Sequence, residues 1–264
     1  MVPSLVENIS KKKPTTNTNH NKPMKTKTFI TAAVLATAMH ASAAVISFSD
    51  AFTDDASTGI NSLNTYTHTV SGGSAQTVNG VSFDLLNSTT TPANFSWTSS
   101  TGGKAQLTDF PNSWDPATGG VTGTDTIDLL TDFAFAGGPS NSQNFTLSGL
   151  NIGQDYETRI YIRQFSDGGR PIDFDFTNGA ELDSTSFDED KPTDLGYAND
   201  DNAYYLSYSF TAQATSLSID AAVVDPSEGG FHLYALSNQF VPEPSSTALL
   251  GLGGVALMLR RRRK

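Results

Sequence analysis

No cysteine occurs anywhere in this chain of 264 residues. This absence excludes a disulfide framework and thiolate metal sites, so the folded part must be stabilised by its core. Histidine is scarce as well, with four residues, whereas a zinc enzyme usually needs three protein ligands. His20 and His40 lie in segments that we expect to be removed or unstructured. We interpret the remaining two, His68 and His232, as ordinary strand residues.

Cations are rare between the two ends of the chain. Of the 16 Lys and Arg residues, six lie at or before Lys27 and five at or after Arg260. Residues 44–241 therefore retain five cations against 25 Asp and Glu, a formal charge of −20. This balance argues against a nucleic-acid partner, because phosphate contacts need clustered cations. Two interpretations of the acidity stay open: solubility of an extracellular body, and carboxylates that hold divalent cations.

The first 43 residues have the order of an export signal. Residues 1–23 are polar and contain lysine, and we expect a disordered leader or a mis-assigned translation start there. Met24 begins a better start, with two lysines, an apolar stretch (29–39) and the small residues Ala41-Ser42-Ala43. This charged, apolar, small-residue order is that of a secretory signal peptide. We predict a signal peptide at 24–43, cleaved after Ala43, with Ala41 and Ala43 as its cleavage-site residues.

The last 24 residues, 241–264, form a second segment of the same kind. Pro242, Glu243 and Pro244 come first, an apolar run (247–259) follows, and five cations end the chain. As a helix, this run would rise only about 20 Å. A bilayer core is roughly 30 Å thick, so the run is a marginal span that the terminal cations lengthen by snorkelling. The alternative is a buried core helix followed by a solvated basic end.

These parts can be assigned residue by residue. The predicted membrane anchor consists of Thr247, Leu249, Leu250, Leu252, Val255, Leu257 and Leu259, and the basic stop consists of Arg260, Arg261, Arg262, Arg263 and Lys264. With the Pro-Glu-Pro motif before them, they resemble the PEP-CTERM sorting signal of Gram-negative bacteria. The resemblance implies processing by an exosortase, a precursor that is transiently in the inner membrane, and a mature protein at the cell surface or outside the cell. It also implies a setting rich in exopolysaccharide.

Residues 44–240 have the pattern of one all-β domain. Apolar residues alternate in short runs, turn-forming residues punctuate the gaps, and no stretch shows a convincing period of 3.6 residues. We predict a single β-sandwich of jelly-roll or Greek-key type, flanked by the signal peptide and a short C-terminal transmembrane helix. The expected strands are 45–48, 65–70, 78–85, 94–98, 126–135, 144–147, 156–165, 172–176, 204–211, 216–221 and 231–236, with long polar loops at 99–123 and 178–202.

A turn and a hairpin are the clearest local features. Tyr156 opens a strand after the turn around Gly149, a position where a tyrosine hydroxyl commonly bonds back to the turn. Strand 156–165 is expected to pair with strand 172–176, so that Ile162 faces Phe174 and Arg163 faces Asp173. Apolar residues would then meet on the core face and opposite charges on the other face.

The candidate ligand-binding residues are Trp114, Arg159, Tyr161 and Arg163. Trp114 lies in a long polar loop, where an exposed ring could stack on a sugar. The other three alternate along one face of their strand and could meet hydroxyl groups and a ring. Two structural alternatives stay open: Trp114 covers the end of the sandwich as a plug, and the arginines only pair with anions across strands.

Acidic loop residues are the candidate metal ligands. Asp188, Asp190, Asp194 and Asp200 lie within one polar loop, and calcium takes six to eight oxygen ligands. Their spacing does not match the twelve-residue calcium loop, and solvated loop charge is the alternative. Apart from this candidate calcium site, the sequence indicates no cofactor.

Three functions follow in order of support. The first is a non-catalytic module that binds carbohydrate or other extracellular matrix material. The second is a structural or adhesive surface protein without a small ligand. A secreted hydrolase has the least support, because no Gly-x-Ser-x-Gly elbow joins a strand to a helix and no pair of carboxylates stands out for glycoside hydrolysis.

Overall fold

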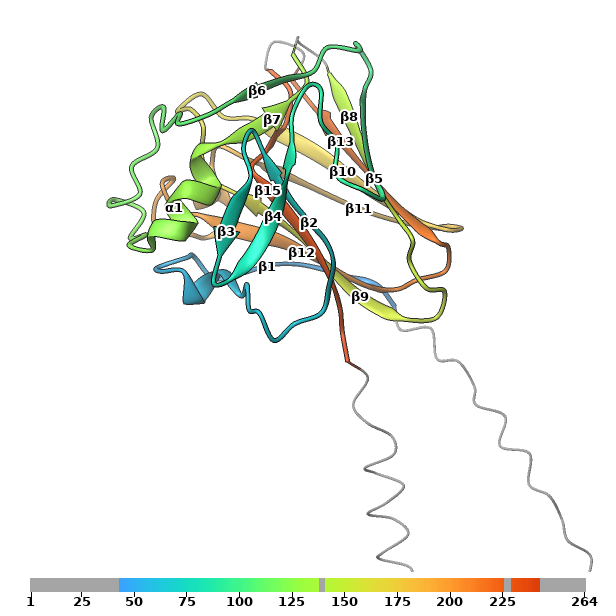
Figure 1. Cartoon of the computed structure of the whole chain (residues 1–264). Coiled ribbons are helices and arrows are strands. Elements are labelled where there is room, and N and C mark those ends of the chain that lie inside the picture. The colour runs from blue at the N-terminus through green and yellow to red at the C-terminus, as the bar shows by residue number, and fades with distance from the viewer. Residues whose placement is uncertain (1–42, 138–140, 226–228, 243–264) are drawn as a thin grey trace, which may run out of the picture. The chain divides into compact units, whose positions relative to one another are not determined.

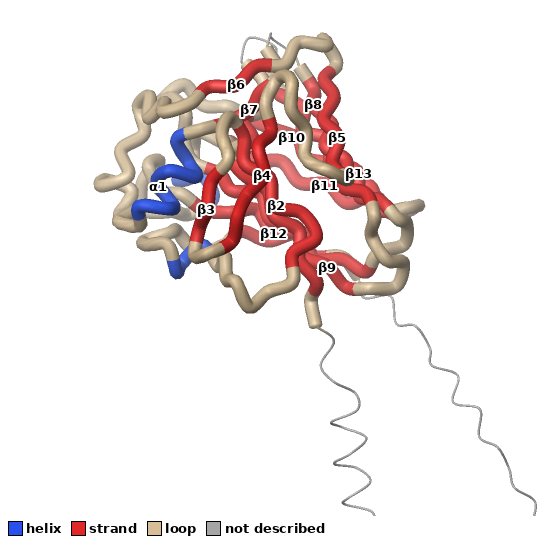
Figure 2. The backbone as a smooth tube through the Cα atoms, viewed as in Figure 1, coloured by secondary structure: helices blue, strands red, loops and turns tan. Residues whose placement is uncertain are grey.

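A computed structural model describes residues 43–137, 141–225 and 229–242 (Figures 1 and 2). The leader at 1–23, the signal peptide up to Ser42 with Ala41, and the sorting segment from Glu243 onward lie outside the described residues. The expected anchor residues and basic stop are therefore outside them as well. In the described ranges, none of the helices combines the length and the apolar character needed to cross a bilayer.

Two large sheets and one small sheet make up the body, as the red strands of Figure 2 show. The first sheet has the order β1 (Val45–Phe48), β12 (Tyr204–Thr211), β9 (Asp155–Ile162), β15 (Ala235–Phe240), β2 (Tyr66–Gly72), β4 (Val81–Leu86) and β3 (Gln76–Val78). The second has the order β11 (Glu181–Asp188), β10 (Pro171–Asn178), β13 (Ser216–Val223), β8 (Ser142–Ser148) and β5 (Phe95–Ser99). The small sheet comprises β14 (His232–Leu233), β7 (Phe133–Phe135) and β6 (Ala105–Leu107). The short helices are η1 (Ala56–Thr58), α1 (Thr124–Thr131) and η2 (Pro192–Leu195). The predicted β-sandwich is confirmed.

The main core lies between the two large sheets. It is built from the apolar half of each alternating strand. In β10, Phe174 and Phe176 are buried whereas Asp173 and Asp175 are exposed. Phe176 stacks on Tyr208 of β12, with ring centroids 4.4 Å apart, which joins the two sheets. Full burial of one such side chain contributes roughly 1.5–3 kcal/mol.

A second core covers the other face of the first sheet. Segments that are far apart in the sequence contribute to it, among them α1 and the loop that contains Trp114 (Figure 1). The body therefore has three layers: the second sheet, the first sheet, and a layer of loops and helix. The buried members of the second core are Phe52, Ile60, Val78, Val81, Phe83, Trp114, Val121, Leu129, Leu130, Phe133, Tyr161, Ala203, Tyr234 and Ala235.

Three of the expected strands take a different form, and one of them, 231–236, is divided between β14 of the small sheet and β15 of the first sheet. The stretch expected as strand 126–135 is α1 followed by β7. The carboxylate of Asp55 accepts hydrogen bonds from the backbone N–H and the hydroxyl of Thr126 (2.8 and 2.7 Å), and so satisfies donors at the helix N-terminus from a distant segment. The expected strand 78–85 is a hairpin of β3 and β4, turned at Asn79 and Gly80 with positive φ angles of 50° and 77°.

The expected hairpin between strands 156–165 and 172–176 is wrong. β9 lies in the first sheet between β12 and β15, whereas β10 lies in the second sheet between β11 and β13. Ile162 therefore faces Tyr204 of β12 rather than Phe174. Because the same apolar alternation runs through all of these strands, it does not select the partner. The tyrosine corner is confirmed, since the Tyr156 hydroxyl accepts a hydrogen bond from the backbone N–H of Asn151 at 2.9 Å.

Candidate functional site

The side chains expected to form one ligand-binding row do not share an exposed face. Trp114, Tyr161 and Arg163 retain 3%, 0% and 0% of their exposed surface, and Arg159 is partly exposed. The alternation in β9 is as expected, because Tyr161 lies on the face opposite Ile160. That face, however, is covered by the second core at this end of the strand. The expected open row is therefore buried at Tyr161 and Arg163, and the Trp114 ring is a buried member of the second core.

Arg163 holds the loop layer to the end of β9. Its guanidinium lies between the rings of Trp114 and Tyr234, 5.0 and 4.7 Å from the two ring centroids. Burial is the main cause that lowers the pKa of Arg163. The expected partner Asp173 is in the other sheet. Arg163 instead donates hydrogen bonds to the backbone carbonyl oxygens of Leu130 (2.8 Å), Phe110 (2.7 Å), Gln164 (2.6 Å) and Pro111 (3.2 Å).

Two of the four expected calcium ligands are bound by nearby backbone donors. The carboxylate of Asp188 accepts hydrogen bonds from the backbone N–H groups of Arg170 and Asp190, at 2.6 and 2.9 Å. The carboxylate of Asp190 is fully buried and accepts from the backbone N–H of Phe165 at 2.6 Å and the hydroxyl of Ser166 at 3.0 Å. These oxygens are already used inside the protein.

The other two expected ligands belong to a separate turn. Asp200 accepts hydrogen bonds from the backbone and hydroxyl of Thr193 and pairs with Lys191 at 3.4 Å. Asp194 lies in η2 and is exposed. Among the residues that the structure describes, no three His, Cys, Asp or Glu side chains are grouped to hold a metal. The expected calcium site is therefore not assembled, because local donors separate its four carboxylates.

A buried charged cluster takes the place of the expected metal site. The Arg170 Nε lies 3.5 Å from the Asp190 carboxylate, and the His232 Nδ1 lies 3.7 Å from the Glu189 carboxylate. Burial raises the pKa of Glu189 well above its ordinary value, although the Arg170 charge opposes this. Burial, reinforced by the charges of Arg170 and Arg163, lowers the pKa of His232 well below its ordinary value. The cluster connects three parts of the chain: the segment between β9 and β10, the residues that follow β11, and β14.

His232 makes the stability of the body depend on pH. Because its pKa is depressed in the folded state, it contributes stability above its ordinary pKa of 6.5 that is lost as the pH falls. We expect the wild-type free energy of unfolding to lose about 1.4 kcal/mol more than that of His232→Phe between pH 7.5 and 5.5. Urea unfolding of both proteins at the two pH values measures this. Equal pH dependence of the two proteins would exclude the effect.

The half of the first sheet nearest the chain ends has a polar face that is only partly covered. The strand registers place residues there in cross-strand rows. One row contains Ser207, Arg159 and Ser237, and the next contains Ser209, Glu157 and Gln239. Arg159 and Glu157 retain 12% and 17% of their side-chain exposure, unlike the fully buried Arg163. Of the expected row, only Arg159 therefore stays partly accessible, and its neighbours Ser207 and Ser237 are buried.

A connected set of polar side chains crosses this half of the first sheet. We call this set the Arg159 network. It consists of Arg159, Glu157, Ser207, Gln239 and Asn64. The Glu157 carboxylate accepts from Arg159 Nη2, Ser207 Oγ and Gln239 Nε2, each at 2.8 Å, and Gln239 Oε1 accepts from Asn64 Nδ2 at 2.8 Å. These bonds hold the guanidinium and the amides in defined positions.

Electrostatics keep the Arg159 network charged. Burial alone would raise the pKa of Glu157, but the hydrogen bonds and the charge of Arg159, with Ser207 and Gln239, lower it overall. The Arg159 guanidinium also stacks over Tyr205, 4.7 Å from the ring centroid. Its Nη1 donates to the Gly59 carbonyl oxygen at 2.8 Å. A Cβ at Gly59 would lie 2.5 Å from this nitrogen, and the positive φ of 69° at this position favours glycine.

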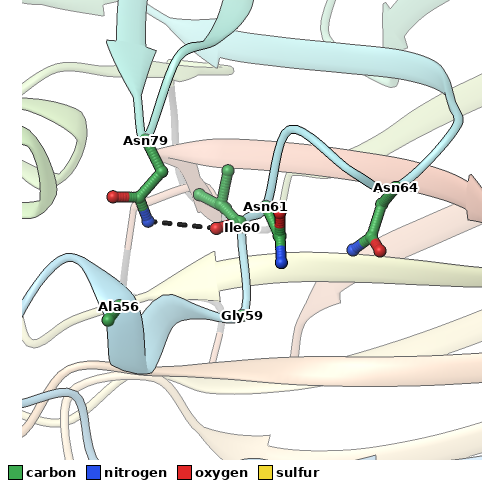
Figure 3. Close-up of a pocket in the computed structure, with 6 residues that line it drawn as sticks. All are labelled: Ala56, Gly59, Ile60, Asn61, Asn64 and Asn79. Atoms are coloured by element: carbon green, nitrogen blue, oxygen red, sulfur yellow. Dashed lines mark hydrogen bonds between the residues drawn. The ribbon is translucent and has the colours of Figure 1, made fainter.

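An open pocket adjoins the Arg159 network at Gly59. It has a volume of about 350 Å³ and is lined by Ala56, Gly59, Ile60, Asn61, Asn64 and Asn79. Figure 3 shows the Asn61 and Asn64 side chains projecting to the same side of their loop, while Asn79 donates to the Ile60 carbonyl oxygen at 3.0 Å. Among the described residues, Asn61 Nδ2 and Asn64 Oδ1 have no protein partner. This pocket, which we call the asparagine pocket, thus offers a free amide donor and a free amide acceptor.

The asparagine pocket was not expected from the sequence. Asn61 and Asn64 lie between predicted strands, and asparagine in such a gap indicates only a turn. The Asn79-Gly80 pair is a strong signal for a two-residue hairpin, and it could have placed Asn79 at a turn. No local signal shows that this turn meets the loop 59–64.

The described chain leaves β15 at Phe240 and ends at Pro242. Residues 240–263 match the family model of the PEP-CTERM protein-sorting motif. The resemblance stated from the Pro-Glu-Pro motif, the apolar run and the basic end is confirmed. This PEP-CTERM motif begins at the last residue of β15, so it adjoins the folded body without a spacer. It indicates an exported precursor that passes through the membrane.

Comparison with known proteins adds little about the body. No curated protein matches the chain. Among solved structures, the carbohydrate-binding module TmCBM61 in complex with β-1,4-galactotriose is similar with 6% identity and a TM-score of 0.32, over 57% of this chain and 90% of that chain. A family 35 carbohydrate-binding module from Cellvibrio japonicus shares 11% identity with a TM-score of 0.29, over 55% and 91% of the two chains. Similarity at this level does not bear on the ligand.

Proposed function

We propose that this protein is an exported cell-surface protein, processed by an exosortase through its PEP-CTERM motif, whose β-sandwich body binds carbohydrate without catalysing a reaction. The precursor is held transiently in the inner membrane. The mature body meets polysaccharide at the cell surface or outside the cell. Its formal charge of −20 over residues 44–241 makes nucleic acid an unsuitable partner.

One observation supports carbohydrate binding above all: the Arg159 network lies beside the asparagine pocket. Sugars present many hydroxyl groups that both donate and accept hydrogen bonds. The site offers the Asn61 amide donor, the Asn64 carbonyl acceptor and the Glu157–Arg159 pair, all held by existing bonds. Because such a site is pre-organised, less conformational entropy is lost on binding.

The structural or adhesive alternative has its own support. Aromatic rings that would stack on a sugar are largely inside the body, since Trp97 and Trp114 are 2% and 3% exposed. The asparagine pocket also has no ring among its lining residues. A body without a small ligand would need no more than this.

A glycan array on residues 44–241 separates the two functions, and this range contains every residue of both cores. We expect a bound glycan whose affinity falls at least tenfold, about 1.4 kcal/mol, in Asn61→Ala. Asn144→Ala, on the second sheet, is the matched control and should bind as the wild type does. Absence of binding to any glycan would favour the structural alternative, whereas equal loss in both variants would show that the asparagine pocket is not the binding site.

A further inference from the structure

Both described ends of the chain emerge at one end of the body, as Figure 1 shows. Ala43, Val45 and Val241 line one shared pocket. The backbone N–H of Val241 donates to the Asp155 carbonyl oxygen at 2.9 Å, and the N–H of Phe240 donates to that of Thr65 at 3.0 Å. The predicted signal-peptide cleavage site at Ala43 and the first residues of the PEP-CTERM motif, Phe240 and Val241, are therefore neighbours in space.

Exposed apolar side chains gather at this same end; we call Val45, Leu63, Ile152 and Val241 the terminal patch. Their exposed fractions are 55%, 88%, 62% and 38%. Leu63 lies in the turn 61–64, which is next to the end of β15 in space. Ile152 lies in the turn 151–154, which directly precedes β9 in the sequence. Single exposed apolar residues are ordinary on protein surfaces. A group of them on turn tips at one end indicates a contact surface.

The terminal patch has no cation among the described residues. Arg163 and Arg170 are buried, and Arg159 is bound to Glu157. Lys191 pairs with Asp200, and Lys104 lies over the Trp97 ring, both away from this end. A contact made by the terminal patch would therefore depend on apolar burial rather than on attraction to anionic groups.

The length of chain after the body limits what the terminal patch can face. Only Glu243, Pro244, Ser245 and Ser246 separate Pro242 from the apolar run 247–259. A fully extended chain spans at most about 3.5 Å per residue, so Pro242 lies within roughly 17 Å of the start of the run. Whenever that run is in a bilayer, this end of the body must face the bilayer surface.

We infer that the terminal patch rests on the lipid bilayer while the precursor is held by its C-terminal apolar run. Leu63 and Ile152 enter the interfacial region, as exposed apolar side chains of peripheral proteins do. The half of the first sheet that carries the Arg159 network then stands beside the membrane, and the opposite end of the body points away from it. This inference rests on the proposed sorting function, because it requires the apolar run to be in the membrane.

Single-cysteine labelling of the full chain tests this orientation, since the chain has no cysteine of its own. Leu63→Cys, Ile152→Cys, Val224→Cys and Val255→Cys carry a bimane fluorophore in phosphatidylcholine nanodiscs that contain a headgroup nitroxide lipid. Val224, at 51% exposure beside the start of β10, is the matched exposed control, and Val255 reports insertion of the apolar run. We expect at least twofold stronger quenching at positions 63 and 152 than at 224, unchanged at high salt.

The outcomes separate the two levels of the proposal. Quenching at 255 with positions 63 and 152 no different from 224 overturns the membrane contact and leaves the anchoring function intact. Absence of quenching at 255 overturns both. Quenching at 63 and 152 that appears only with anionic lipid and disappears in high salt would also contradict the inference, because the terminal patch acts through apolar burial.

Discussion

Replacing Arg163 with methionine is expected to lower the free energy of unfolding by about 3–5 kcal/mol, the cost of breaking a buried charged arrangement. The substitution removes the guanidinium donor from four backbone carbonyl oxygens, those of Leu130, Phe110, Gln164 and Pro111, of which Pro111 keeps the Trp114 N–H as a donor. It also removes the cation between the rings of Trp114 and Tyr234. Urea unfolding at neutral pH, followed by tryptophan fluorescence, measures the change.

Arg159→Met is the matched control for this prediction. Arg159 is partly exposed and donates to one carboxylate and one carbonyl oxygen. Its loss should cost about 2 kcal/mol, the scale of a hydrogen bond to a charged group, because Glu157 keeps its bonds from Ser207 and Gln239. Arg163→Lys should recover little of the stability lost in Arg163→Met, because an ammonium cannot reproduce the planar fork of donors of a guanidinium. Equal losses in the two methionine variants would show that Arg163 does not hold the loop layer.

Replacing Gly72 with alanine is expected to destabilise the body by about 3 kcal/mol or more, at the upper end of overpacking. A Cβ at this position would lie 2.1 Å from the Leu233 carbonyl oxygen and 2.4 Å from the Ala134 nitrogen. Both obstacles are backbone atoms of the small sheet, so they cannot move aside as a flexible side chain can. The first sheet and the small sheet would have to separate at this point.

Gly137→Ala controls for the general effect of adding a methyl group. A Cβ at Gly137 meets no atom within 4 Å, so its effect should stay within about 0.5 kcal/mol. Thermal unfolding of both variants provides the comparison. A Gly72→Ala protein as stable as Gly137→Ala would contradict the close approach of β2 to β7 and β14.

Strand positions follow closely from the sequence wherever polar and apolar residues alternate. The predicted strands 45–48 and 204–211 coincide with β1 and β12. Alternation fails to predict the secondary structure where β-branched residues occur in a helix, as in α1. The N-terminus of α1 is stabilised by the Asp55 carboxylate, which binds Thr126 from 71 positions away and so leaves no local signal. It fails again at β11, whose residues are mostly small and polar, so that a stretch of strand was expected as loop.

The candidate site was harder to predict than the strands. β9 was expected to present Arg159, Tyr161 and Arg163 on one face, and it does so. Whether that face meets solvent depends on the loop layer, which covers Tyr161 and Arg163 and leaves Arg159 partly open. The asparagine pocket likewise needs the hairpin turn at Asn79 to meet the loop around Asn61. Burial of this kind is set by segments distant in the sequence.

The sorting motif and the all-β character of the body could be predicted from the order of residues alone. Both depend on local order: Pro-Glu-Pro before an apolar run and a basic end, and alternation with a period of two residues. Strand pairing and the partial exposure of one half of the first sheet become visible only in the folded body. A period of two distinguishes the two faces of a strand, but it does not identify the neighbour that covers either face.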